Sequence, residues 1–179
     1  MKKLILGIIL AGLAAFMWGA FYWMGPITSN VFKTQPDDTA FRQVLLDNLP
    51  ESGTYYVPNT GVNEESMRLM EQGPIALIHF IREGKSANMG LSMMLGILLN
   101  VFTALVIVLL LKIAINKLNS YGKRVGFVAL IGLVAAFYAH MSGALWWYHA
   151  ATWTMILFLY DFSVYLVSGL VLAAFIKPE

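Results

Sequence analysis

Residues 91–111 read LSMMLGILLNVFTALVIVLLL and carry no charged side chain. Because a helix rises 1.5 Å per residue, a run of about 20 apolar residues crosses the hydrocarbon core of a bilayer. Three further runs reach a similar length, at Leu4–Met24, Val125–Trp146 and Trp153–Ile176. Nothing in the chain alternates as the strands of a membrane β-barrel do. The sequence therefore predicts an all-α membrane protein with four transmembrane helices, packed as a four-helix bundle.

The composition agrees with this class and excludes several others. Hydrophobic residues make up 59% of the 179 and charged residues only 12%, about half the charged share of a soluble domain. A chain without cysteine has no disulfides, thiolate metal sites, iron–sulfur clusters or CxxC redox chemistry. The net charge of +2 is small and scattered, which gives no basis for nucleic-acid binding.

The distribution of lysine and arginine predicts the orientation. Lys2 and Lys3 precede the first run, four basic residues lie in 112–124, and Lys177 follows the fourth run. These regions share one side of a four-span protein, and they hold seven of the twelve basic residues with one acid, Glu179. The opposite side has five basic residues and eight acids. By the positive-inside rule we expect both termini in the cytoplasm.

The first run also resembles a secretory signal, since two lysines precede it. Bulky residues at 16–18 occupy the place of a small-x-small cleavage site, so we expect the segment to be retained as a transmembrane helix. Aromatic residues gather near the outer ends of the spans and predict a belt at the membrane interface. They are Trp18, Tyr22, Trp23, Trp146, Trp147, Tyr148 and Trp153.

Residues 25–90 predict a small extracytoplasmic α/β cap between the first two spans, which divides the chain into 1–24, 25–90 and 91–179. Gln35-Pro36-Asp37-Asp38 is typical of a helix start, and Pro50 would end that helix. Residues 53–57 and 74–81 are β-prone, and Glu64–Glu71 is expected to be a short helix. A unit this small does not fold alone, so we expect it to pack on the outer helix ends or on another subunit.

Three short stretches carry a resemblance that covers most of the chain. They are Gly53-Thr54-Tyr55-Tyr56-Val57-Pro58, then Gly73-Pro74-Ile75-Ala76, and the helix from Asp161 through Gly169 to Lys177-Pro178. Together they resemble poorly characterised four-span bacterial inner-membrane proteins of similar size. The resemblance implies a bacterial inner membrane and no activity. The chain differs from the four-span signal peptidases II, which need two facing intramembrane aspartates where this sequence has Asp161 alone.

Asp161 is the most informative polar residue, because it lies about ten residues into the fourth span, near the membrane midplane. A carboxylate there costs at least about 2.5–3.5 kcal/mol, so it should be partnered or face the bundle. We expect it to contact Asn100 of the second span, with Gly96 permitting close approach. Three further polar residues share its helix face: Thr154, Tyr165 and Ser168. The site is interpreted either as a proton or ion site or as a buried polar clamp between helices.

Histidine and methionine suggest a second, metal-binding hypothesis on the outer side. His140, His149 and His79 all fall toward that side, and Met141 lies at a similar depth. Histidine with methionine suits copper, and paired membrane histidines suit haem. The spacing includes no HxH, HxxxH or HExxH pattern, so the competing interpretation is that these histidines form hydrogen bonds at the headgroup level.

The sequence contains no recognisable catalytic set, and this shapes the functional hypothesis. The leading interpretation is a non-catalytic accessory or scaffold subunit of a larger bacterial inner-membrane complex. Its expected partners are membrane lipids, some of them bound, and other integral membrane subunits or a second copy of the chain. The alternatives are a proton or small-solute transport component that uses Asp161, and an outer-face copper or haem redox subunit.

Overall fold

The computed structural model describes residues 2–59 and 61–177, of which most are helical. Pro178 and Glu179, which the sequence analysis used, lie outside the described residues. In chain order the elements are α1 (Lys2–Met24), α2 (Asp38–Asn48), β1 (Gly53–Val57), α3 (Glu64–Gln72), β2 (Ala76–Phe80), α4 (Gly90–Ala114), the 3-10 turn η1 (Ile115–Lys117), α5 (Tyr121–Trp147) and α6 (Ala151–Phe175).

Four of these helices, α1, α4, α5 and α6, are long and apolar enough to cross a membrane, which confirms the predicted number. Their ends lie within a few residues of the predicted runs. The basic connection between α4 and α5 is ordered by the turn η1 and by Ser120, whose hydroxyl accepts a hydrogen bond from the Lys123 amide at 3.2 Å. This N-cap fixes where α5 begins.

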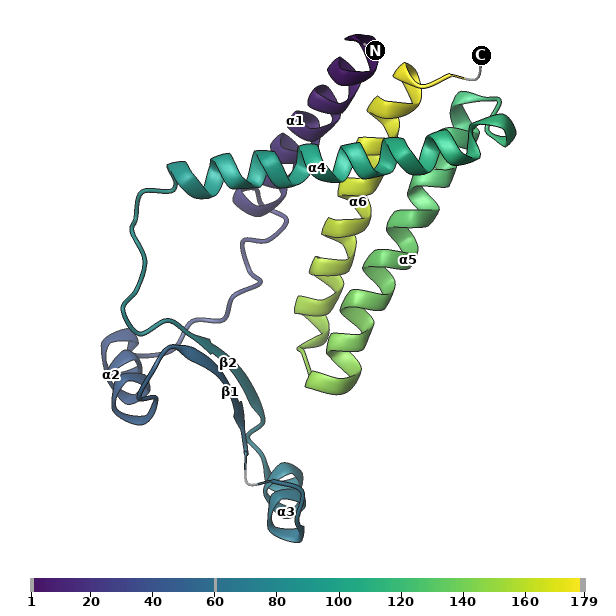
Figure 1. Ribbon diagram of the computed structural model, residues 1–179. Coiled ribbons are helices and arrows are strands. Elements are labelled where there is room, and N and C mark those ends of the chain that lie inside the picture. The colour runs from purple at the N-terminus through teal and green to yellow at the C-terminus, as the bar shows by residue number, and fades with distance from the viewer. Residues whose placement is uncertain (1, 60, 178–179) are drawn as a thin grey trace.

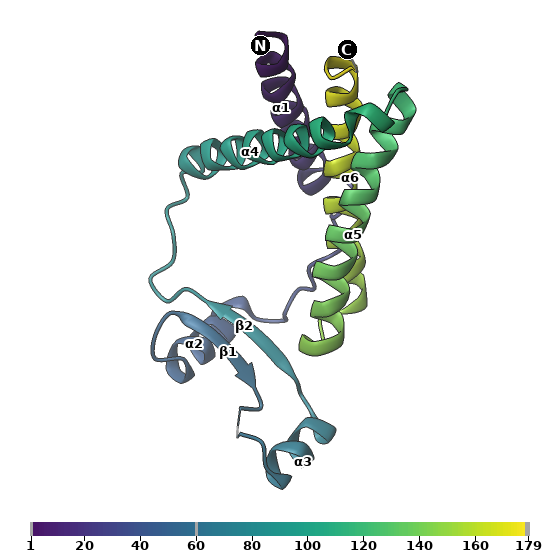
Figure 2. The same cartoon turned by 45° about the vertical axis from the view of Figure 1, so that its right-hand side comes forward.

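Three of the four long helices are aligned, and the fourth crosses them. Helix α6 packs against α1 and α5, and these three run side by side with both chain ends at the same end (Figure 1). Helix α4 runs across them, as a second view confirms (Figure 2). At Gly12 of α1 a Cβ atom would lie 2.8 Å from the backbone N and Cα of Val101. Glycine thus lets the two backbones touch where α4 crosses α1.

The core lies where α4 crosses the other three helices. Side chains from all four helices meet there, and most are fully buried. The members are Ala11, Ala104, Ile107, Val108, Leu111, Val128, Leu172 and Ile176. A small residue from α1, Ala11, and larger ones from α4 and α6 fill this crossing. The core therefore sits toward the chain ends, and the opposite halves of α5 and α6 extend beyond it (Figure 1).

The cap lies on the side of the structure away from the chain ends, beside and beyond the α5–α6 turn (Figure 1). Strands β1 and β2 form an antiparallel hairpin with Gly53 opposite Phe80. The side chain of Asp37 accepts a hydrogen bond from the Ala40 amide at 2.9 Å and caps α2, as its sequence predicts. The predicted strands and helices of the cap are confirmed to within about two residues. A contact between the rings of Tyr56 and Trp147, at 6.1 Å, joins the hairpin to α5.

Candidate functional site

Within residues 2–59 and 61–177, one contact between a basic and an acidic side chain lies within ion-pair distance, and it joins the middle of α6 to α5. His140 Nε2 lies 2.6 Å from Asp161 Oδ2, a short hydrogen bond between two ionisable groups. His140 is seven residues from the end of α5 and Asp161 ten residues from the start of α6. At 1.5 Å per residue, the pair lies about 10–15 Å along the helices from the α5–α6 turn.

The turn between α5 and α6 brings these two residues opposite each other. It contains only residues 148–150, and Tyr148 adopts the left-handed conformation with φ 54°. The His149 amide then donates to the Gly143 carbonyl, an arrangement that commonly closes a helix. Farther along α5 and α6, a Cβ atom on Gly132 would lie 2.4 Å from the Cβ of Tyr165. Glycine at this position therefore allows the two helices to pack closely. Antiparallel neighbours this close place His140 beside Asp161.

This geometry corrects the expected contact between Asn100 and Asp161. The Asn100 side-chain amide donates instead to the Gly96 carbonyl of its own helix, at 2.8 Å. A Cβ atom on Gly96 would approach Phe16 of α1 at 3.2 Å, so this part of α4 faces α1. The reason is the crossing of α4, which carries its first half away from α6 (Figure 1).

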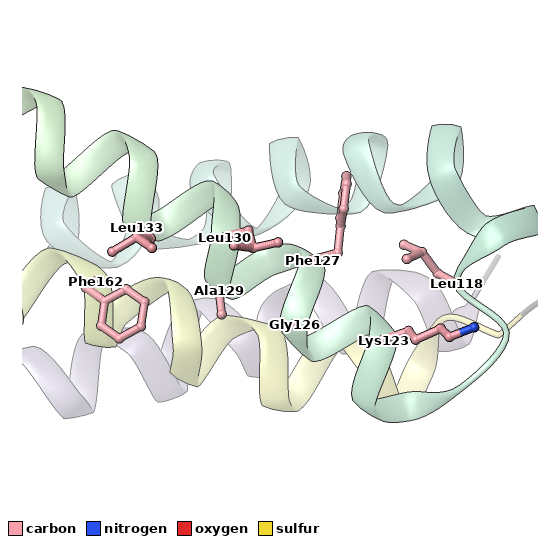
Figure 3. Close-up of a pocket in the computed structure, with 8 residues that line it drawn as sticks. All are labelled: Leu118, Lys123, Gly126, Phe127, Ala129, Leu130, Leu133 and Phe162. Carbon is pink, nitrogen blue, oxygen red and sulfur yellow. The ribbon is translucent and has the colours of Figure 1, made fainter.

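The two side chains of the pair differ in their exposure to the outside of the chain. The His140 side chain is 15% exposed, whereas the Asp161 side chain is 41% exposed on the surface of the chain. One carboxylate oxygen is therefore held by the imidazole while the group remains accessible from outside the chain. The next residue, Phe162, lies at one end of an apolar groove of about 580 Å³ that runs along α5 toward Lys123 (Figure 3). Asp161 thus presents a carboxylate beside an otherwise apolar helix surface.

The other residues predicted to share the polar face with Asp161 are packed against a neighbouring helix or buried. Tyr165 packs on Gly132, and Ser168 is fully buried. Thr154 is 4% exposed, and its hydroxyl has no hydrogen-bond partner in the described part of the chain. These side chains share the helix face predicted from the sequence, but no hydrogen bond among the described residues links them to Asp161.

Aromatic residues hold α1 against α6. Trp18 donates from Nε1 to the Ser163 hydroxyl at 2.7 Å, and the Tyr22 hydroxyl donates to the Ile156 carbonyl at 2.9 Å. The rings of Tyr22 and Tyr160 lie 5.2 Å apart. Part of the predicted aromatic belt is therefore an interhelical cluster. The side chains at 146–148, by contrast, are exposed, as a belt requires.

The residues of the metal hypothesis occupy separate places. His79 Nδ1 lies 3.0 Å from the Thr54 hydroxyl in the cap, and His140 is engaged by Asp161. The His149 ring lies against Gly143, and Met141 lines a shallow groove on α5. Among the residues that the structure describes, no three histidine or acidic side chains are grouped as a metal site. No group of that kind supports the copper or haem hypothesis, which stays a prediction.

The sequence analysis missed the partner of Asp161, although the signal was present. His140 and Asp161 lie at similar distances on either side of a short turn, which places them at one depth in an antiparallel pair. No known protein family, curated protein or solved structure matches the chain. The proposals below therefore rest on its own geometry.

Proposed function

We propose that the chain is a non-catalytic subunit of a larger membrane assembly, and that its α5–α6 face docks against a neighbouring membrane helix. One observation carries this proposal: Asp161, in the middle of a helix apolar enough to span a membrane, is 41% exposed at the surface of the chain. A charged side chain in hydrocarbon costs at least about 2.5–3.5 kcal/mol. A partner that covers Asp161 with a polar group removes that penalty.

The surroundings of Asp161 support docking rather than exposure to lipid. His140 occupies one carboxylate oxygen, so the rest of the group is available to a donor on a neighbouring helix. The adjacent apolar groove, which ends at Phe162, offers packing surface for that helix (Figure 3). Interhelical hydrogen bonds and close packing are what drive association of helices within a bilayer. The partner is either a different integral membrane subunit or a second copy of the chain.

Purification of the full-length chain in mild detergent tests the proposal. We expect a particle larger than the 19.9 kDa chain, measured by native gel and by light scattering corrected for detergent. Asp161→Leu should dissociate it, because the buried polar contact is lost. Leu170→Ala, at a similarly exposed position of the same helix, is the matched control and should leave it intact. A monomeric wild-type chain with no co-purifying protein contradicts the proposal.

A second candidate function is proton movement, and the His140–Asp161 pair specifically favours it. A lone acid is a poor relay, but here two ionisable groups share a hydrogen bond of 2.6 Å. Chains of acidic and histidine side chains carry protons in membrane pumps and transporters. Four helices of one chain rarely enclose a path across a membrane, so this function requires an oligomer in which partner helices complete the path.

Proton flux into proteoliposomes, followed with a pH-sensitive dye, tests this second candidate. Asp161→Asn and His140→Gln should each abolish the flux, because each removes one titrating member of the pair. Tyr165→Phe keeps the ring that packs on Gly132 and should retain it. Flux unchanged in Asp161→Asn would refute proton movement through this pair, while the docking proposal would stand.

We further propose that the chain lies in a bacterial inner membrane with both termini in the cytoplasm and the cap outside. The clustering of basic residues at one end of the structure supports this orientation. Single cysteines placed at Ser29 and Ser120 should be labelled by an impermeant maleimide from opposite sides of the membrane. Labelling of both from one side contradicts the topology.

A further inference from the structure

The basic end of the structure contains a cleft between the ends of three helices. Leu4 from the start of α1 lies on one side, Phe175 and residues 176–177 at the end of α6 on another, and the end of α4 with η1 completes it. Both chain ends and the α4–α5 connection meet at this end (Figure 2). The cleft has a volume of about 460 Å³, which is in the range of small-molecule sites.

The lining of this cleft is amphipathic. The polar residues of its lining are Lys112, Lys177 and Asn116. None of the lining residues in the described part of the chain is acidic. The rest of the lining is apolar, from Leu4, Ile115, Phe175 and Ile176. Two cations and an amide donor beside an apolar wall suit a ligand with an anionic head and an apolar body.

A buried arginine strengthens the positive potential at this end. Arg124 is only 5% exposed, yet it forms no ion pair within the described residues. Its Nε donates to the Ala173 carbonyl at 3.1 Å and its Nη1 to the Leu118 carbonyl at 3.0 Å. These two carbonyl oxygens, one from α6 and one from the α4–α5 connection, accept hydrogen bonds from the guanidinium but carry no formal charge to balance it. The same contacts tie the α4–α5 connection to the end of α6.

We propose that this cleft binds the phosphate group of an anionic phospholipid, held by Lys112, Lys177 and Asn116. Basic pockets between membrane helices at the headgroup level bind such headgroups. The apolar walls favour a lipid over free phosphate, because they contact the glycerol and the first carbons of the acyl chains. The site differs from the groove of Figure 3, which is apolar and has Lys123 at one end. The proposal does not depend on the function of Asp161.

Native mass spectrometry of the full-length chain in detergent, titrated with phosphatidylglycerol or phosphatidylcholine, tests the site. We expect one phosphatidylglycerol to bind more tightly than phosphatidylcholine. Replacing both lysines, in K112Q/K177Q, should weaken that binding by about 25-fold, since each basic group near a membrane surface contributes about fivefold. The matched control K117Q/K123Q removes the same charge from the same end but not from the cleft, and should weaken binding much less than K112Q/K177Q does.

Two further arms identify the source of the phosphate and guard against misfolding. Asn116→Asp places a carboxylate in the cleft while keeping both lysines, so it should also weaken phosphatidylglycerol binding. Inorganic phosphate and glycerol 3-phosphate should fail to displace the lipid at equal concentration. Displacement by either overturns the lipid assignment in favour of a soluble phosphate ligand. Equal losses of phosphatidylglycerol binding in K112Q/K177Q and K117Q/K123Q overturn the site itself, because they indicate an effect of general surface charge only.

Discussion

Replacing His140 and Asp161 by alanine, singly and together, measures how strongly the pair couples α5 to α6. His140 Nε2 and Asp161 Oδ2 lie 2.6 Å apart. Hydrogen bonds to ionised groups are about twice as strong as neutral ones. Hydrogen bonds between membrane helices average about 0.6 kcal/mol and reach about 1.7 kcal/mol in such cycles. We therefore expect a coupling free energy of about 1–1.7 kcal/mol, in the upper part of that range.

The free energy of unfolding can be measured by titration with dodecyl sulfate, followed by the fluorescence of the five tryptophans. A parallel cycle on Asn100 and Asp161 is the matched control, because the Asn100 amide bonds to its own helix. Its coupling should stay within about 0.3–0.5 kcal/mol, the usual scatter of additive mutations. A coupling below that scatter for His140 and Asp161, or a larger one for Asn100 and Asp161, would refute the assignment of partners.

Three other predictions concern packing, buried polarity and pH. Gly12→Ala should destabilise the chain by about 1–3 kcal/mol in the same unfolding assay, because the new Cβ would lie 2.8 Å from backbone atoms of Val101. The control Gly126→Ala should not, because its new Cβ would meet no neighbouring described residue within 4 Å. Thr154→Val should leave stability unchanged or raise it by about 1 kcal/mol, since the buried hydroxyl it removes has no hydrogen-bond partner among the described residues. A loss of more than about 1 kcal/mol would reveal such a partner. A hydrogen bond from Ser52, at 2.6 Å, holds the pKa of Glu83 below its ordinary 4.5. The stability that this bond adds to the cap should persist above pH 4.5 and vanish as the pH falls through the lowered pKa. In Ser52→Ala, NMR titration of the Glu83 carboxyl should show that its pKa rises. An unchanged pKa of Glu83 would contradict the contact.

The sequence determined the elements of this protein because each is specified by neighbouring residues. Runs of about 20 apolar residues predict helices that can span a membrane, and Asp37 followed by an apolar face predicts a capped helix. The hairpin strands at 53–57 and 76–80 follow from β-prone residues between turn residues. The concentration of lysine and arginine in three regions likewise predicts which ends of the helices lie together. All of these properties are local, so they are readable without knowing how the helices pack.

Only the tertiary structure decided the partner of Asp161 and the course of α4. A parallel bundle places Asn100 at the depth of Asp161, whereas contact of Gly12 with the Val101 backbone turns α4 across α1 and directs that part of the helix to another neighbour. The short turn at 148–150 then leaves His140 as the group opposite Asp161. A hydropathy pattern records which residues avoid water, but lipid and protein are equally apolar neighbours for a membrane helix. Crossing and pairing are therefore set by backbone contact at glycines and by hydrogen bonds, which appear only once the helices have packed.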